Sequence, residues 1–148
     1  MTGAQRTSIA NILLVDDNNM GLMARKTVLQ ELGHRVITAL NAHDALEVCG
    51  KQRFDLLITD YKMPKMNGVE LIRELRKVQP QVSVILISGF TDTLGLNEAN
   101  TGADVVIQKS ANEVSHLVRS VNRLMRPASK KPPGSQSSPR PTGRRKQV

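Results

Sequence analysis

Short aliphatic runs alternate along this chain with amphipathic stretches, and this repetition constrains the fold more than any other feature. Five runs have the length and the β-branched or leucine-rich composition of strands: Ile12–Val15, Arg35–Ala39, Asp55–Thr59, Ser83–Ser88 and Asp104–Gln108. Several of them are apolar at nearly every position, which is expected when helices cover both faces of a sheet. The pattern therefore predicts a parallel sheet buried between helices.

The stretches between the runs have apolar residues three and four positions apart, as in a helix with one buried face. These positions are Leu22, Val28, Leu29 and Leu32, then Ala42, Ala45, Leu46 and Cys49, then Val69, Leu71, Ile72 and Leu75. Residues Asp92–Asn100 contain Gly95 and few large apolar side chains, so we expect a short or frayed helix there. Residues Asn112–Met125 begin with an asparagine cap and predict the last helix. Repeated βα units with right-handed crossovers predict a doubly wound, three-layer α/β domain.

Charge and composition divide the chain near its C-terminal end. Residues 1–125 carry 14 basic and 13 acidic side chains, whereas residues 126–148 carry 7 basic and no acidic ones. From residue 127 onward Pro, Ser, Gly, Lys and Arg dominate, so too little apolar surface is available to offset the entropy of ordering. We expect a short leader over residues 1–8, one domain over 9–126, and a disordered basic tail over 127–148.

The composition gives no sign of a secreted or membrane protein. The first ten residues contain one basic residue and no long apolar run, and the single cysteine, Cys49, cannot form an internal disulfide. We therefore expect a cytoplasmic protein without membrane contact, as a monomer or weak dimer. The tail lacks aromatic residues that would stack on bases, so any contact with nucleic acid would be electrostatic and confined to this tail.

Acidic residues gather where two of the predicted strands end. Asp16 and Asp17 follow the first run and Asp60 follows the third, while Ser88 ends the fourth and Lys109 follows the fifth. In an open parallel sheet the ligand site lies beyond the carboxyl ends of the strands. Repelling carboxylates there suit a hard divalent ion such as Mg²⁺, and the ammonium and hydroxyl groups suit an anion. Together these residues predict phosphoryl transfer, with Asp60 as the nucleophile.

The motifs around these residues resemble the receiver domains of two-component response regulators. The resemblance covers Ile9–Arg126. It rests on Ile12–Asn18, on Asp55–Asp60 with Met63-Pro64 and Asn67–Glu70, on Ile87–Gly89, and on Gly102–Asp104 followed by Lys109. It implies a flavodoxin-like (βα)5 fold, with Asp60 as the phosphoacceptor and with Ser88 and Lys109 binding the phosphoryl group. It also implies that Mg²⁺ is held by Asp16, Asp17, Asp60 and the backbone carbonyl of Lys62.

The resemblance implies a phosphoacceptor signalling domain that catalyses only its own phosphorylation and dephosphorylation. A histidine kinase or a phosphotransfer protein would donate the phosphoryl group from a phosphohistidine. A downstream protein would bind a surface formed by residues 92–125. Since no second folded domain is expected after residue 126, we expect a single-domain response regulator in a phosphorelay.

Several positions bear on how such a domain would switch. Val106 stands where the family usually has a Tyr or Phe that rotates inward, and Ser110 stands where it often has a Pro with a cis peptide bond. Lys62 and Phe90 flank the path of the hydrolytic water in the family, and here they favour a persistent phosphoryl group. Two alternatives stay open at this point. One is a degenerate receiver that binds partners without phosphorylation, and the other is a flavodoxin-like domain for a small ligand, whose phosphate Asp16 and Asp17 would repel.

Overall fold

The computed structural model describes residues 8–89 and 95–126, so Phe90, residues 92–94 of the predicted fourth helix, most of the predicted leader and the predicted tail lie outside the described residues. Its strands are β1 (Asn11–Val15), β2 (Arg35–Ala39), β3 (Leu56–Asp60), β4 (Ser83–Ser88) and β5 (Val105–Gln108). They form one parallel sheet in the order β2-β1-β3-β4-β5. Its helices are α1 (Asn19–Glu31), α2 (Ala42–Cys49), α3 (Gly68–Val78), α5 (Glu98–Thr101) and α6 (Glu113–Leu124). The predicted flavodoxin-like fold class is confirmed.

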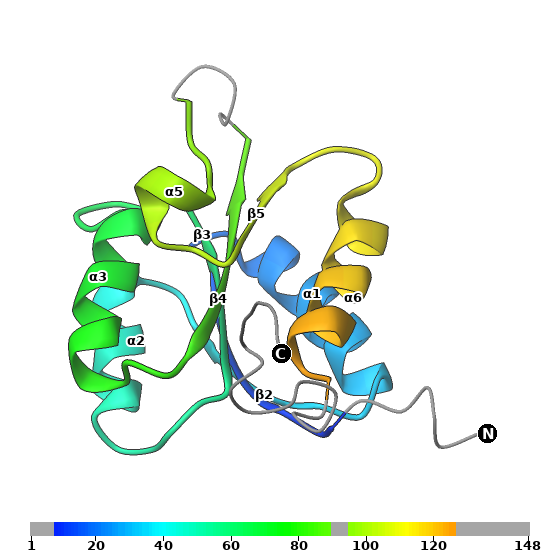
Figure 1. The fold of residues 1–148 in the computed structure, drawn as a ribbon, viewed down its shortest axis with the longest axis horizontal. Coiled ribbons are helices and arrows are strands. Elements are labelled where there is room, and N and C mark those ends of the chain that lie inside the picture. The colour runs from blue at the N-terminus through cyan, green and yellow to red at the C-terminus, as the bar shows by residue number, and fades with distance from the viewer. Residues whose placement is uncertain (1–7, 90–94, 127–148) are drawn as a thin grey trace, which may run out of the picture.

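The sheet lies between two layers of helices, with α1 and α6 on one side and α2, α3 and α5 on the other (Figure 1). Successive side chains of β1 enter different layers, because residues of a strand point alternately to its two faces. Ile12 and Leu14 pack with Leu22 of α1 and Leu117 of α6, whereas Leu13 belongs to the core cluster on the α2 and α3 side. Burial on both faces explains why the central strands are apolar at nearly every position, as the sequence indicated.

Asparagines cap most of the described helices, with one exception. Asn18, Asn41, Asn67 and Asn97 have extended backbones, and each side chain accepts a hydrogen bond from a backbone N–H in the first turn. The predicted cap by Asn112 is wrong, because this residue has φ −97° and ψ 9° and its side chain makes no capping bond. The Ser110 hydroxyl instead accepts the Asn112 N–H at 3.2 Å, and α6 begins at Glu113.

The fourth predicted helix is short in the described residues, as its glycine and its lack of large apolar side chains indicated. It covers only Glu98–Thr101 and ends at Gly102, whose φ is 82°. The Oε2 atom of Glu98 accepts the backbone N–H of Val106 at 2.8 Å. This contact satisfies a donor on β5, which is an edge strand of the sheet. Within residues 8–89 and 95–126, every helix is too short or too polar to cross a membrane.

Candidate functional site

The topology of the sheet brings the predicted acidic residues together. β1 and β3 are neighbours, and Val15 pairs with Thr59 at their carboxyl ends. Asp16 follows β1 directly, and Asp60 is the last residue of β3, one position later than the predicted strand end. A cleft of about 580 Å³ opens at this edge of the sheet. It is lined by Asp16, Asp17, Asn18, Asp60, Lys62, Met63, Pro64, Gly89 and Lys109.

Three carboxylates line this cleft. Asp16 and Asp60 are buried, with 1% and 4% of their surface exposed, while Asp17 is exposed. One oxygen from each residue lies within 4.8 Å of the others. Oxygen donors that converge in this way, two of them shielded from water, fit a hard divalent cation such as Mg²⁺. The predicted ligand set of Asp16, Asp17 and Asp60 is therefore gathered at one place, and Lys62 lies on the wall of the same cleft.

Asp60 is paired with Lys109, the residue that follows β5. The Nζ atom of Lys109 lies 2.8 Å from Oδ1 of Asp60. Burial raises the pKa of Asp60, the hydrogen bond and charge of Lys109 lower it, and the charge of Asp16 raises it, leaving the pKa above its ordinary value. An added cation in the cleft would favour the ionised carboxylate, since an opposite charge stabilises the charged form.

Ser88 and Lys109 come together through the backbone at the ends of β4 and β5. The N–H of Lys109 donates to the carbonyl of Ser88 at 3.0 Å. Ser88 is buried, with 1% of its surface exposed, and Gly89, which follows it, lines the cleft. The loop after Lys109 has an ordinary trans geometry, since no cis peptide bond occurs among the described residues. Val106 is half-buried and packs against the core cluster on the α2 and α3 side of the sheet.

Arg25 is a site residue that our sequence interpretation missed. Its Nη1 lies 2.5 Å from Oδ2 of Asp16, and its Nε lies 2.6 Å from Oε2 of Glu113. Burial lowers the pKa of Arg25, but the hydrogen bonds and charges of Glu113 and Asp16 raise it above its ordinary value. A signal was present in the sequence, because position 25 lies between Leu22 and Leu29 on the buried face of α1. A charged residue on such a face needs a partner.

Gly68 lies in the Asn67–Glu70 motif, but the sequence analysis assigned it no role of its own. It is the first residue of α3, and its N–H donates to the carbonyl of Tyr61 at 2.8 Å. A β-carbon at this position would lie 2.4 Å from the carbonyl oxygen of Asp60 and 2.8 Å from the Leu86 side chain. The absence of a side chain thus lets α3 start directly against the end of β3.

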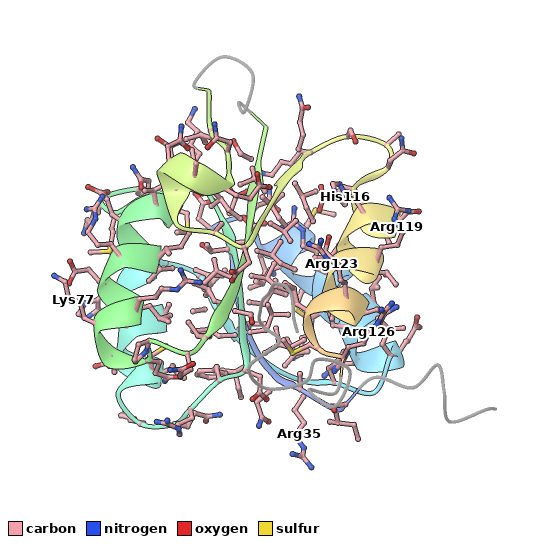
Figure 2. The ribbon with its side chains drawn as sticks, viewed as in Figure 1. Arg35, Lys77, His116, Arg119, Arg123 and Arg126 are labelled. Atoms are coloured by element: carbon pink, nitrogen blue, oxygen red, sulfur yellow. The ribbon has the colours of Figure 1, made fainter. Side chains whose placement is uncertain are left out.

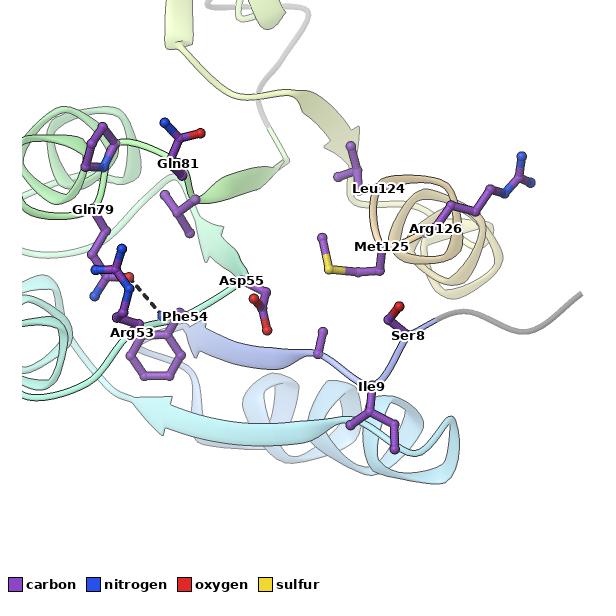
Figure 3. A pocket seen from close by; sticks show the side chains of 13 residues that line it. Ser8, Ile9, Arg53, Phe54, Asp55, Gln79, Gln81, Leu124, Met125 and Arg126 are labelled. Atoms are coloured by element: carbon purple, nitrogen blue, oxygen red, sulfur yellow. Dashed lines mark hydrogen bonds between the residues drawn. The ribbon is translucent and has the colours of Figure 1, made fainter. Parts of the chain in front are cut away.

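A second cavity, of about 480 Å³, lies at the opposite edge of the sheet, where the strands begin (Figure 3). Its lining includes Phe54, whose N–H donates to the Gln79 side chain at 2.8 Å. Arg53, Asp55 and Arg126 are its charged residues, and the Asp55 carboxylate already accepts the backbone N–H of Asn11. This cavity does not combine converging carboxylates with a paired lysine. The cleft at the carboxyl ends of the strands is therefore the candidate site.

Comparisons of the whole chain with known proteins find matches in one family. The family model of the response regulator receiver domain matches residues 12–122. A response regulator receiver protein of Anaeromyxobacter sp. (strain Fw109-5) is 40% identical over 76 residues, which are 51% of this chain and 32% of that protein. Sensor kinase CckA of Brucella abortus (strain 2308) is 35% identical over 85 residues, 56% of this chain and 9% of that protein. The chain thus spans less than a third of the length of these two curated relatives.

Among solved structures, the response regulator protein TrrA of Thermotoga maritima, in complex with Mg²⁺ and BeF, is 31% identical. Its TM-score is 0.70, and the match covers 78% of this chain and 99% of that one. A receiver domain protein from Clostridium thermocellum has the same TM-score of 0.70 at 30% identity, over 79% of this chain and 94% of that one.

Proposed function

The chain belongs to the response regulator receiver domain family of two-component signalling, and from this premise we propose that Asp60 accepts a phosphoryl group from a phosphohistidine. The donor is a sensor histidine kinase or a phosphotransfer protein. The observation that carries this proposal is the buried Asp60 carboxylate, 2.8 Å from the Lys109 ammonium and beside two further carboxylates. This arrangement combines a nucleophile with groups of both charges that phosphoryl transfer requires.

In the proposed reaction an ionised oxygen of Asp60 attacks the phosphorus atom. A bond forms between this oxygen and phosphorus, and the bond between phosphorus and the donor imidazole nitrogen breaks. Lys109 neutralises charge on the phosphoryl oxygens, and the Ser88 hydroxyl donates a hydrogen bond to them. Because burial raises the pKa of Asp60, the Lys109 charge favours the ionised form that acts as the nucleophile.

Asp16, Asp17, Asp60 and the backbone carbonyl of Lys62 would hold Mg²⁺ in this site. The convergence of three carboxylate oxygens supports this part of the proposal, as does the Mg²⁺ complex of the relative from Thermotoga maritima. The ion would neutralise charge on the transferring phosphoryl group, as divalent cations do in phosphoryl transfer. Asp17 is the most accessible of the three acids that would hold the ion.

The downstream partner would bind the predicted surface of residues 92–125, of which the structure describes 95–125. Along α6, the basic side chains of His116, Arg119 and Arg123 are exposed, and Arg126 continues the same row (Figure 2). Because unlike charges steer association, we expect a partner whose contact surface is acidic. Replacing Arg119 and Arg123 by Glu should then abolish capture of that partner without changing phosphorylation of Asp60.

Phosphorylation is tested by intact-mass measurement after incubation with acetyl phosphate and Mg²⁺. Wild type should gain the mass of one phosphoryl group, and Asp60→Asn should not. Asp44→Asn is the matched control, since Asp44 is an exposed acid on α2 and should leave labelling unchanged. Label that persists in Asp60→Asn would show that another residue is the acceptor.

The degenerate receiver is the alternative that this experiment separates. Its expected result is a folded wild-type protein that gains no mass with Mg²⁺ and acetyl phosphate, while partner capture is unaffected by the phosphodonor. The pairing of Lys109 with the buried Asp60 favours a receiver that is phosphorylated over a degenerate one. Burying a charged carboxylate costs free energy, and a site without the reaction would have no use for it.

A further inference from the structure

Arg25 connects the carboxylate cluster to α6. It bridges Asp16 and Glu113 through two different nitrogens, at 2.5 Å and 2.6 Å. The side chains of Arg25, Asp16 and Glu113 are 8%, 2% and 16% exposed, so this network is shielded from water. Arg25 and Glu113 lie 88 residues apart in the sequence, and Glu113 is in the first turn of α6. Removing one partner of a shielded ion pair leaves an uncompensated charge, so the three groups respond to one another.

Both oxygens of Asp16 are already engaged by the protein itself. Its Oδ1 accepts the N–H of Asn18 at 2.9 Å, and its Oδ2 accepts from Arg25. A divalent cation at Asp16 must therefore share this carboxylate with a guanidinium, and the two positive charges repel. Glu113 offers Arg25 a second carboxylate when its hold on Asp16 weakens. Arg25 thus pairs with one carboxylate in the cleft, Asp16, and with another on α6, Glu113.

The first turn of α1 leaves room for this contact. A β-carbon at Gly21 would lie 3.0 Å from Oδ2 of Asp16 and 3.7 Å from Nη1 of Arg25. Real β-carbons rarely come so close to an oxygen, so a side chain at position 21 would push against the carboxylate that Arg25 holds. The glycine is an observation independent of the ion pairs, and it places the same three groups in one packed arrangement.

We propose that Arg25 is a positioning residue that sets the cation affinity of the site and links its occupation to the first turn of α6 through Glu113. The inference rests on the proposed function, since the cation is the one that transfer to Asp60 would use. Cation binding at Asp16 shifts the pairing of Arg25 toward Glu113. By reciprocity, a partner that engages Glu113 changes the cation affinity by the same factor.

The test is calorimetric titration of Mg²⁺ alone into the full chain, so its readout is independent of phosphorylation. Arg25→Met removes the competing charge and should tighten Mg²⁺ binding by about tenfold. Glu113→Gln removes the second partner, leaves Arg25 on Asp16 and should weaken binding by about threefold. Arg35→Met is the matched control for charge. Arg35 is exposed at the start of β2, at the end of the sheet opposite the cleft (Figure 2).

The double variant Arg25→Met/Glu113→Gln distinguishes a link through Arg25 from a simple charge effect. With Arg25 absent, the Glu113 substitution should no longer change Mg²⁺ affinity. Equal weakening in both backgrounds would mean that Glu113 acts by its charge alone, which overturns the proposed link. An Arg25→Met affinity equal to that of Arg35→Met would overturn the role of Arg25 while leaving the proposed function intact.

Two further results of the Mg²⁺ titration test the role of Arg25. Binding by Arg25→Met but not by wild type would support competition by Arg25, and no binding by either would overturn both this inference and the Mg²⁺ site. Melting curves establish whether each variant folds. If Arg25→Met does not fold, hydrogen exchange of wild-type amides 113–118 replaces it, and Mg²⁺ should change their protection. Unchanged protection at saturating Mg²⁺ would overturn the link to α6.

Discussion

Gly68 packs so closely against Asp60 that a β-carbon at position 68 would lie 2.4 Å from the carbonyl oxygen of Asp60. The contact joins the start of α3 to the last residue of β3. The backbone of the candidate phosphoacceptor, Asp60, is therefore in close contact with a glycine, where a side chain would not fit.

Gly68→Ala should destabilise the domain by about 1–3 kcal/mol, the usual cost of forcing an extra carbon into a packed site. Gly50→Ala is the matched control, since a β-carbon there would meet its nearest neighbour at 3.4 Å and the backbone φ is an ordinary −74°. Urea denaturation of both variants measures the difference. Equal stabilities for the two alanine variants would show that β3 and α3 adjust freely around position 68.

Lys109→Met should raise the pKa of Asp60 further. Lys109 is the group that lowers this pKa most, through a hydrogen bond at 2.8 Å and through its charge, while burial acts in the opposite direction. Titration of the Asp60 carboxyl carbon by NMR in the absence of divalent cations measures the shift. Lys77→Met, which removes an exposed lysine of α3, should leave the Asp60 titration where it was. An unchanged pKa in Lys109→Met would contradict the pairing.

Asp60→Asn should raise the melting temperature at neutral pH without divalent cations. The folded-state pKa of Asp60 is raised above its ordinary value of 3.8, so its ionisation costs stability once the pH exceeds this value. Each 1 kcal/mol of cost removed would raise the melting temperature by roughly 4 °C. Mg²⁺ should raise the melting temperature of wild type more than that of Asp60→Asn, because it binds only the folded site. A lower melting temperature for the variant would contradict this prediction.

His34 should make the domain lose stability in mild acid. Burial lowers its pKa below the ordinary value of 6.5, and its Nδ1 accepts the backbone N–H of Ala10 at 3.0 Å. Protonation of Nδ1 would destroy this acceptor. The contribution of His34 is therefore fully present above its unfolded pKa and is lost as the pH falls below it, by at most about 1.4 kcal/mol per pH unit.

His34→Gln removes this titration while it retains a side-chain acceptor, so its stability should fall less steeply between pH 7 and pH 5. His43→Gln is the control, because His43 is exposed on α2. Urea denaturation across this pH range is the measurement. Parallel pH profiles for wild type and His34→Gln would mean that another group causes the loss.

The sequence by itself determined the order of strands and helices and the gathering of the carboxylates. Buried parallel strands are apolar at nearly every position, so the runs at residues 12–15, 55–59 and 83–88 were visible as strands without knowledge of their neighbours. A parallel sheet has all its carboxyl ends at one edge, and this rule alone brings Asp16, Asp60 and Lys109 to one cleft. Local periodicity and one rule of topology were sufficient for these predictions.

Only the tertiary structure decided which groups meet these carboxylates. Arg25 and Glu113 are 88 residues apart in the sequence. Arg25 reaches both Asp16 and Glu113 because α1 and α6 pack on the same face of the sheet. The cap of α6 was assigned to Asn112 by residue type, but its near-helical backbone makes Ser110 the acceptor instead. The space that excludes a side chain at Gly68 is created by β3 and β4 together. Such contacts depend on distances between separate elements, which the pattern of a single segment does not contain.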